Sequence, residues 1–467
     1  MVVLYLFKWK HPYDIVSLKV IIFGINLNMQ FQSGFWASLL VSAQISNGLH
    51  IQAHGGGLIK VNDTFYLVGE DHTNGASFQN VNCYSSKDLV QWEYQGALLS
   101  LTNTAGDLGP SRVVERPKVL WNERTQKYVM WMHIDSSSYG EAKVGVAVGD
   151  TVCGKYQYLN SSQPLGFQSR DMGLFQDDDG TAYLLSEDRA NGLRIDRLSD
   201  DYLTVVNATY LWPDHIEAPA MIKINGRYYM FGSHLTGWAP NDNVYTTSTS
   251  ITGPWSSWTI FAQSGSLTYQ SQTNYVLKLS NSEAFYLGDR WISSDLGSSS
   301  YIWLPLNISG TSVNMPYFSS WVPNVSGATA EGSWKVSPPN SFYEGETGTY
   351  ANGAKSVSCS GCSGGGSAGW LGGPSNGTVT FHQISSSVDT MTTITIQYRN
   401  GDSKPRFGAV VVNGGTPVKL EYLPSGSGVS NSTLHTLLRK GNNTITLGGI
   451  GDTTYAADVD RLIVPVS

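Results

Sequence analysis

One pattern recurs five times in this chain and constrains its fold more than any other feature. Each copy has a polar residue, an apolar stretch, a tight turn and a second stretch rich in aromatic residues. In the clearest copy, Glu217 precedes an apolar stretch at 218–224, an Asn-Gly pair and an aromatic stretch at 227–231. An Asn-Gly pair between two such stretches predicts a β-hairpin with a type I′ turn. The other copies open at His54, Glu115, Asp171 and Gln272.

The spacing of the copies indicates the architecture. The opening residue and the strand tyrosine lie 12, 13, 12, 12 and 14 positions apart, and successive tyrosines lie 62, 55, 46 and 57 apart. A hairpin repeat of roughly 50 residues is typical of β-propeller blades. We therefore predict five blades within residues 50–325. Because the first strand of each blade lines the central channel, the five opening residues should converge on one mouth of it.

Three of the opening residues are acids: Glu115, Asp171 and Glu217. Carboxylates that share one funnel repel each other, which raises at least one pKa. A glycosidase needs such an arrangement, because it requires one protonated carboxyl and a polar partner across the scissile bond. The alternative is structural: the acids cap strand ends or pair with the nearby arginines, Arg116, Arg170 and Arg290.

Composition limits the partners and the compartment. A net charge of −7 and a pI near 5.7 argue against nucleic acid or an anionic membrane as partner. The eight Asn-x-Ser/Thr sequons favour a secreted glycoprotein; they are Asn62, Asn160, Asn207, Asn307, Asn324, Asn376, Asn431 and Asn442. In that setting the four cysteines oxidise. We expect a Cys359–Cys362 bridge, and a Cys83–Cys153 bridge follows by elimination.

The two ends of the chain differ from the repeat region. Residues 1–49 are interpreted as a signal sequence with a doubtful extension, because 35–43 resembles the apolar part of a signal peptide before a cleavage site. The native start would then be Met29; a membrane anchor is the alternative. Residues 326–340 are predicted to form a linker. From 341 to 467, period-two alternation and glycine-rich turns predict a β-sandwich.

These motifs resemble a known family. The propeller resembles glycoside hydrolase family 43, and within it the fungal exo-β-1,3-galactanases, through residues 51–57, 115–118, 169–173, 216–219 and 271–274. The C-terminal part resembles a family 35 carbohydrate-binding module, through residues 343–346, 369–373, 398–402 and 457–461. The fold class expected is therefore all-β: a five-bladed propeller followed by a jelly-roll sandwich.

The resemblance implies roles for the opening residues. Glu217 would be the general acid, and its apolar neighbours favour the protonated form. Glu115 would tune the pKa of Glu217 and hold the −1 sugar, to which Asp171 would also bind. Further sugar contacts are predicted at Glu70, Tyr139, His54, Asn191, Thr236 and Trp238.

One position departs from most of the family, whose general base is an Asp at the start of the first blade. Here that place reads Gln-Ala-His-Gly at 52–55, with no carboxylate. In the galactanases the base role falls to a glutamine, which Gln272 matches. An amide is a poor base, so it would act as its imidic acid tautomer or would orient the water. His54 is the second candidate for the base.

In the module, Glu344, Glu346 and Asp460 offer oxygen ligands for a structural calcium ion, or they form a solvated acidic edge. Trp370, Tyr455 and Asp458 are candidates for a galactose-binding face, although Trp370 also suits a sandwich core.

The sequence thus predicts a secreted, monomeric, exo-acting and inverting hydrolase that releases galactose from β-1,3-galactan without a catalytic cofactor. An arabinofuranosidase or xylosidase of the same fold, and a catalytically inactive lectin, remain alternatives.

Overall fold

The computed structural model describes residues 48–280, 283–325 and 333–466. Of the first 47 residues it describes strands only: β1 (Tyr5–Leu6), β2 (Val16–Ile22), β3 (Ile25–Phe31), β4 (Leu39–Leu40) and β5 (Gln44–Ile45). The predicted signal sequence lies outside the described residues, apart from these strands. So does the first half of the predicted linker, residues 326–332.

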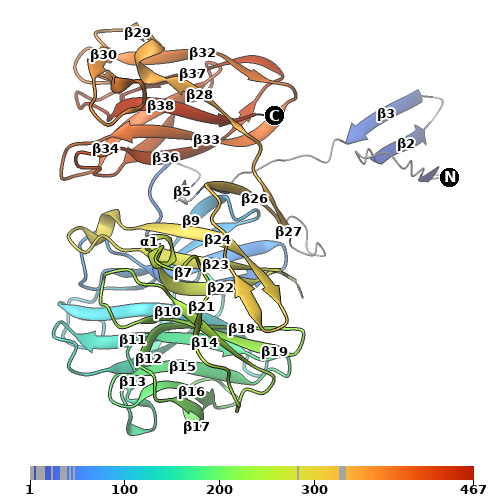
Figure 1. Cartoon of the computed structure of the whole chain (residues 1–467), viewed down its shortest axis with the longest axis vertical. Helices are drawn as coiled ribbons and strands as arrows, with labels where there is room; N and C mark the ends of the chain where they lie inside the picture. Colours follow the sequence, from blue (N-terminus) through green and yellow to red (C-terminus); the bar gives the residue numbers. More distant parts are fainter. Residues whose placement is uncertain are drawn as a thin grey trace.

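In the described part of the chain, five sheets of antiparallel strands follow one another and form the lower body in Figure 1. Blade 1 contains β6 (His54–Val61), β7 (Thr64–Glu70), β8 (Asn80–Ser86) and β9 (Gln91–Ser100), with β5 parallel to β9. Blade 2 contains β10 (Arg112–Asn122), β11 (Lys127–Ser136), β12 (Lys143–Gly149) and β13 (Gln157–Ser162). Blade 3 contains β14 (Met172–Gln176), β15 (Ala182–Asp188), β16 (Gly192–Leu198) and β17 (Val205–Trp212).

Blade 4 contains β18 (Ile216–Ile224), β19 (Arg227–His234), β20 (Val244–Ser248) and β21 (Thr259–Ile260). Blade 5 contains β22 (Gln272–Lys278), β23 (Glu283–Arg290), β24 (Ser300–Ser309) and β25 (Ser312–Asn314). Short helices lie in the connections: η1 (Pro164–Gly166), α1 (Leu267–Gln270) and η2 (Leu296–Ser298). The first strands β6, β10, β14, β18 and β22 contact one another in a closed ring, so the predicted five-bladed propeller is confirmed.

The innermost strands carry bulges just after their opening residues. The pairing register shifts between His54 and Gly57, between Glu115 and Lys118, and between Glu217 and Ala220. A bulge bends its strand and redirects a side chain. The residue after each of these opening residues has a left-handed backbone: Gly55 (φ 56°), Arg116 (φ 53°) and Ala218 (φ 54°).

Acids of the preceding blade hold these left-handed residues in place. The N–H of Gly55 donates to Asp289 at 3.0 Å, that of Arg116 to Glu70 at 2.7 Å, and that of Ala218 to Asp171 at 3.0 Å. Each blade junction of this kind therefore uses a carboxylate as a structural acceptor. The structural interpretation of the acids is thus partly right, because Asp171 is one of them.

The C-terminal region is a two-sheet sandwich, which confirms the second predicted fold (Figure 1). One sheet has the order β30-β31-β38-β33-β36, with β28 also paired to β38, and the other has the order β29-β32-β37-β34-β35. The first sheet consists of β28 (Asn340–Glu344), β30 (Lys355–Ser358), β31 (Gly366–Gly369), β33 (Thr390–Arg399), β36 (Ser430–Leu438) and β38 (Asp458–Pro465). The second consists of β29 (Thr349–Ala351), β32 (Thr378–Ser386), β34 (Arg406–Val412), β35 (Val418–Tyr422) and β37 (Gly441–Gly448).

Apolar side chains from both sheets form the core between them, centred on residues such as Ile396, Tyr398, Val410 and Leu447. The turns η3 (Gly345–Thr347) and η4 (Ser363–Gly365) lie at one edge. The strands β26 (Ser320–Asn324) and β27 (Ser333–Val336) pair with each other, and β26 also pairs with β4.

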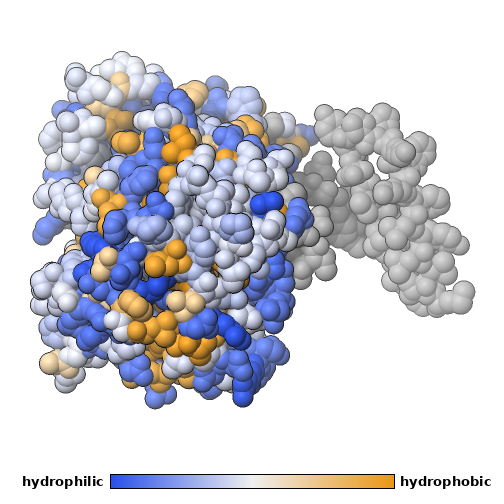
Figure 2. Space-filling view, turned by 60° about the horizontal axis from the view of Figure 1, so that its bottom comes forward, coloured by the Kyte–Doolittle hydropathy of each residue, from blue (hydrophilic) through white to orange (hydrophobic). Residues whose placement is uncertain are grey.

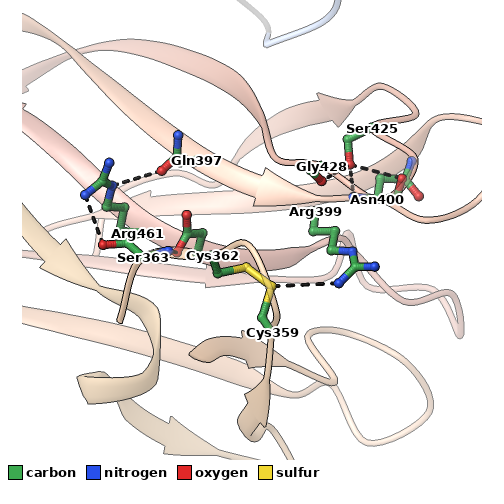
Figure 3. Close-up of a disulfide and its surroundings, with 10 residues drawn as sticks. Cys359, Cys362, Ser363, Gln397, Arg399, Asn400, Ser425, Gly428 and Arg461 are labelled. Carbon is green, nitrogen blue, oxygen red and sulfur yellow. Dashed lines mark hydrogen bonds between the residues drawn. A yellow bond between two sulfur atoms is a disulfide. The ribbon is translucent and has the colours of Figure 1, made fainter. Parts of the chain in front are cut away.

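Both predicted disulfides are present. Cys83 in β8 is bonded to Cys153, which follows β12, so this bridge joins blades 1 and 2. Cys359 and Cys362 close a short loop of the sandwich, and Figure 3 shows the Arg399 guanidinium pointing at the Cys359 sulfur, 3.9 Å away.

The surface in Figure 2 is mostly hydrophilic, with separate hydrophobic patches on the face shown. Of the helices that the structure describes, none has the length and apolar character needed to cross a membrane.

Candidate active site

A cavity of about 230 Å³ opens at the mouth of the propeller where the opening residues meet. Glu115, Asp171, Glu217 and Gln272 all line it, so the repeat alignment brings these four predicted residues together. The remaining lining residues are Glu70, Arg116, His133, Tyr139, Arg170, Arg189, Gly237, Trp238 and Trp291.

Glu217 is the least well compensated acid of the cavity. Its side chain is buried, and its Oε1 accepts a hydrogen bond from Gln272 Nε2 at 2.9 Å. The nearest cation is Arg189, whose Nη2 lies 3.5 Å from Glu217 Oε2. Burial, followed by the charge of Asp171, raises the pKa of Glu217 from 4.5 to about 8. Glu217 therefore holds a proton at neutral pH, as a general acid must.

Glu115 has the opposite environment. It accepts hydrogen bonds from His133 at 3.0 Å and from the Tyr139 hydroxyl at 2.6 Å. Burial alone would raise the pKa of Glu115, but these hydrogen bonds and the charge of His133 lower it below its ordinary value. His133 is itself charged, because its contacts with Asp135 and Glu115 outweigh burial and raise its pKa to about 9. Glu115 is thus an ionised carboxylate at the cavity wall.

Asp171 is held by a cation. The Arg116 Nε lies 2.8 Å from Asp171 Oδ2, the same oxygen that accepts from the Ala218 N–H. Asp171 is also the neighbouring charge that does most to raise the pKa of Glu217. The resemblance implies this tuning role for Glu115, which is not among the groups that shift the pKa of Glu217 most, so that role stays a prediction.

Gln272 has its amide fixed from both ends. Its Oε1 accepts from Arg116 Nη2 at 2.6 Å and from Trp291 Nε1 at 2.9 Å, while its Nε2 donates to Glu217. Arginine and the indole N–H are donors only, so Oε1 must act as the acceptor and the orientation of the amide is unambiguous.

Comparison with known proteins agrees with this geometry. The family model described as glycosyl hydrolases family 43 matches residues 54–286. The exo-β-1,3-galactanase from Phanerochaete chrysosporium, in a structure with galactose, is 40% identical over 91% of this chain and 100% of that chain, with a TM-score of 0.64. The chain belongs to glycosyl hydrolase family 43.

A second structure, described as a putative exo-β-1,3-galactanase from Bifidobacterium bifidum s17, is 39% identical over 61% of this chain and 97% of that chain, with a TM-score of 0.58. An exo-β-1,3-galactanase from Clostridium thermocellum shares 24% identity over 92% of this chain and 100% of that chain, with a TM-score of 0.60, and so supports the fold alone. A search of curated proteins found no match.

The other predicted sugar contacts of this family 43 site divide into two groups. Glu70, Tyr139 and Trp238 line the cavity. His54 does not: it is fully buried (0% exposed), stacks on Tyr301 with ring centres 4.6 Å apart, and contacts Asp289 at 3.2 Å. Asn191 and Thr236 are exposed loop residues outside the cavity lining.

The sequence pattern misses several lining residues of the family 43 site, most clearly Arg116, Arg189 and Trp291. It suggests Arg116 only as a structural partner of the acids. Arg189 follows β15 and Trp291 follows β23, so both lie at the end of a second strand rather than at an opening position. Only this position in the sequence could have identified them, because the end of a blade's second strand lies beside the start of its first strand.

In the sandwich, Trp370 (50% exposed) and Tyr455 (40% exposed) pack edge to face with ring centres 5.5 Å apart. The structure therefore brings two of the three predicted ligand residues together on the surface, and the core interpretation of Trp370 is wrong. Asp458 begins β38, pairs in register with Arg399, and has a pKa raised by burial.

The acids predicted to bind calcium lie around the turn η4. Ser363 donates to Asp460 through its N–H at 2.9 Å and to Glu344 through its hydroxyl at 3.0 Å, and Gly364 lies against the Glu346 carboxylate. One buried oxygen of each of these three acids has no hydrogen-bond partner. Among the described residues, however, no group of three or more His, Cys, Asp or Glu is arranged as a metal site.

Proposed function

We propose that this protein is an exo-β-1,3-galactanase that releases galactose from β-1,3-galactan. The observation that carries the proposal is the contrast between protonated Glu217 and ionised Glu115 in one small cavity. The relative from Phanerochaete chrysosporium, 40% identical over 91% of this chain, is an exo-β-1,3-galactanase with structures bound to galactose and β-1,3-galactotriose.

The size of the cavity supports exo action. Its volume of about 230 Å³ is below the roughly 300–1,000 Å³ of typical ligand pockets. Such a cavity suits one terminal sugar rather than an internal stretch of a polymer. Glu115, Tyr139 and Asp171 supply the polar groups that hold the sugar hydroxyls, and the partly exposed ring of Trp238 suits stacking.

Glu217 donates its proton to the glycosidic oxygen, which makes the galactan leaving group neutral. Gln272 acts in its ordinary amide form. Arg116 and Trp291 both donate to its oxygen, an arrangement that favours C=O over the O–H of an imidic acid. Gln272 Nε2 therefore acts as a hydrogen-bond donor that orients Glu217. A water molecule attacks the anomeric carbon from the face opposite the leaving group as the glycosidic bond breaks, and its proton passes to solvent, so the reaction inverts the anomeric configuration, as is usual in the family.

The sandwich is proposed to bind galactan through Trp370, Tyr455 and Asp458, with the catalytic domain at 50–325 and the module at 341–467. Glu344, Glu346 and Asp460 are the residues that would hold a calcium ion. The support for calcium is their unpaired buried oxygens, since a hard cation prefers oxygen ligands. The ion would stabilise this edge of the sandwich and take no part in catalysis. A rise in melting temperature with Ca²⁺, lost in Asp460→Asn, tests the assignment.

The protein is further proposed to be a secreted, monomeric glycoprotein. Two disulfides are present, and all eight sequon asparagines are exposed to solvent.

The function is tested by incubating the protein with β-1,3-galactan and following the products by chromatography and by ¹H NMR. Galactose as the first product, appearing as the α-anomer, is the expected result. Arabinan and xylan serve as control substrates, and Glu217→Gln as the control variant. Release of arabinose or xylose instead, or binding of galactan without release, would refute the proposal.

A further inference from the structure

Lys118 lies beneath the floor of the active site and has no role in the mechanism described above. It belongs to β10, its side chain is 2% exposed, and it does not line the cavity. No ion pair found in the described ranges involves Lys118. Its ammonium instead donates to two main-chain carbonyl oxygens, that of Gly55 at 2.5 Å and that of Arg116 at 3.4 Å.

The propeller makes room for this side chain at Gly57 of the neighbouring blade. A Cβ atom added at Gly57 would lie 2.7 Å from Lys118 Cδ and 3.5 Å from the Tyr275 ring. Only a residue without a side chain therefore leaves space for the lysine stem between β6, β10 and β22. The position is built for a long straight side chain that ends in a donor.

The two carbonyls belong to the left-handed residues of blades 1 and 2. A left-handed backbone is unfavourable for a residue with a side chain, such as Arg116, and persists only where its surroundings fix it. The Arg116 N–H is fixed by Glu70 and its carbonyl by Lys118. The Lys118 ammonium therefore links the bulge of β6 to the bulge of β10 through the carbonyls of Gly55 and Arg116.

We propose that Lys118 is a positioning residue for the galactanase reaction, because it fixes the bulge from which Arg116 reaches the active site. The Arg116 guanidinium contacts Asp171 at 2.8 Å, Gln272 at 2.6 Å and the Thr273 carbonyl at 3.2 Å. A shift of the Arg116 backbone would release the amide of Gln272. The inference rests on the function proposed above, since it concerns the same site.

Burial of the ammonium supports this view. Burial, and then the charge of Arg116, lowers the pKa of Lys118 to about 7. A buried cation without an ion pair is costly, and a methionine would fill the same space without that cost. What lysine adds is its pair of hydrogen bonds to the bulges.

The test is a double-mutant cycle on β-1,3-galactobiose, a substrate that needs no binding module. Lys118→Met alone should lower kcat/KM about tenfold or more, chiefly through kcat, as expected for groups coupled in one network. In the Gln272→Ala background the same change should cost less than about threefold, because the group that Lys118 positions is gone. Arg189 contacts Glu217 from blade 3. In the Arg189→Met background, the loss of kcat/KM caused by Lys118→Met should therefore be as large as it is in the wild type.

Two further variants separate this proposal from simple misfolding. Gly57→Ala keeps the ammonium but presses on its stem, and should reproduce the kcat loss. Lys223→Met removes a lysine at the opposite end of the channel, paired with Asp177, and should leave kcat unchanged. Equal losses for Lys118→Met in the wild-type and Gln272→Ala backgrounds would overturn the proposal. Absence of galactose release by the wild type would instead refute the proposed function.

Discussion

Replacing Glu217 by glutamine should stabilise the protein while it abolishes galactan hydrolysis. Glutamine has the same shape, and its amide oxygen still accepts the hydrogen bond from Gln272. What it removes is a carboxyl that burial and Asp171 hold at a pKa of about 8, against 4.5 in the unfolded chain. Between these two pH values the native state keeps a proton that the unfolded state has released, so the stability of the wild type falls as pH rises.

The magnitude follows from that difference. For each pH unit in this window, the free energy of unfolding of the wild type falls by about 1.4 kcal/mol. At pH 7 the wild type should therefore be about 3 kcal/mol less stable than Glu217→Gln. At pH 4 both states hold the proton and the two proteins should be equally stable. Above the native pKa the difference levels off.

Thermal unfolding at pH 4 and at pH 7 measures the effect. At pH 7 Glu217→Gln should unfold at least about 4 °C above the wild type, and the gap should close at pH 4. Glu93→Gln, at an exposed glutamate of the outer strand β9, is the control and should show no gap at either pH. A glutamine variant that is no more stable than the wild type at pH 7 would refute the assignment of Glu217 as a buried, protonated acid.

Three other outcomes follow from the contacts. Asp171→Asn should move the basic limb of the pH profile of kcat/KM to lower pH, because it removes the charge that most raises the pKa of Glu217. Arg189→Met should move the same limb to higher pH, because the Arg189 charge lowers that pKa. A limb that does not move in either variant would contradict the electrostatic account. Loss of the bridge in Cys83→Ala/Cys153→Ala, whose cysteines are 70 residues apart, should cost about 2–5 kcal/mol of unfolding free energy, measured by denaturant titration. Trp370→Ala should weaken retention on insoluble galactan without changing galactobiose hydrolysis, and equal losses in both assays would argue against a separate binding face.

The repeat carries most of what the sequence can predict about the site. Because the five copies align on one period, the repeat alone predicts that Glu115, Asp171, Glu217 and Gln272 meet at one mouth, and all four line the same cavity. His54 occupies the equivalent position in blade 1, yet its side chain is buried against neighbouring aromatic and acidic groups. The bulge after His54 is shared with Glu115 and Glu217, so the difference lies in the partners of His54, Tyr301 and Asp289, which no periodic pattern reveals.

Other features depend on contacts between strands and blades that the linear sequence does not reveal. Trp291 lies next to Gln272 only because β23 runs antiparallel to β22 and ends at the same mouth. The partners that set the charge of Glu115 are similarly nonlocal: His133 comes from the neighbouring strand of blade 2. The apolar neighbours of Glu217 in the sequence already favour its protonated form, but the partners that set the charge of each acid are seen only in the three-dimensional arrangement.

The most direct test of the central claim uses two substrates that differ in their need for an acid. β-Galactosyl fluoride has a leaving group that departs without protonation, whereas β-1,3-galactan does not. If Glu217 is the general acid, Glu217→Gln should lose galactan hydrolysis and retain most of its activity on the fluoride. Equal losses on both substrates would show that Glu217 acts in some other way, and the account of the site would be wrong.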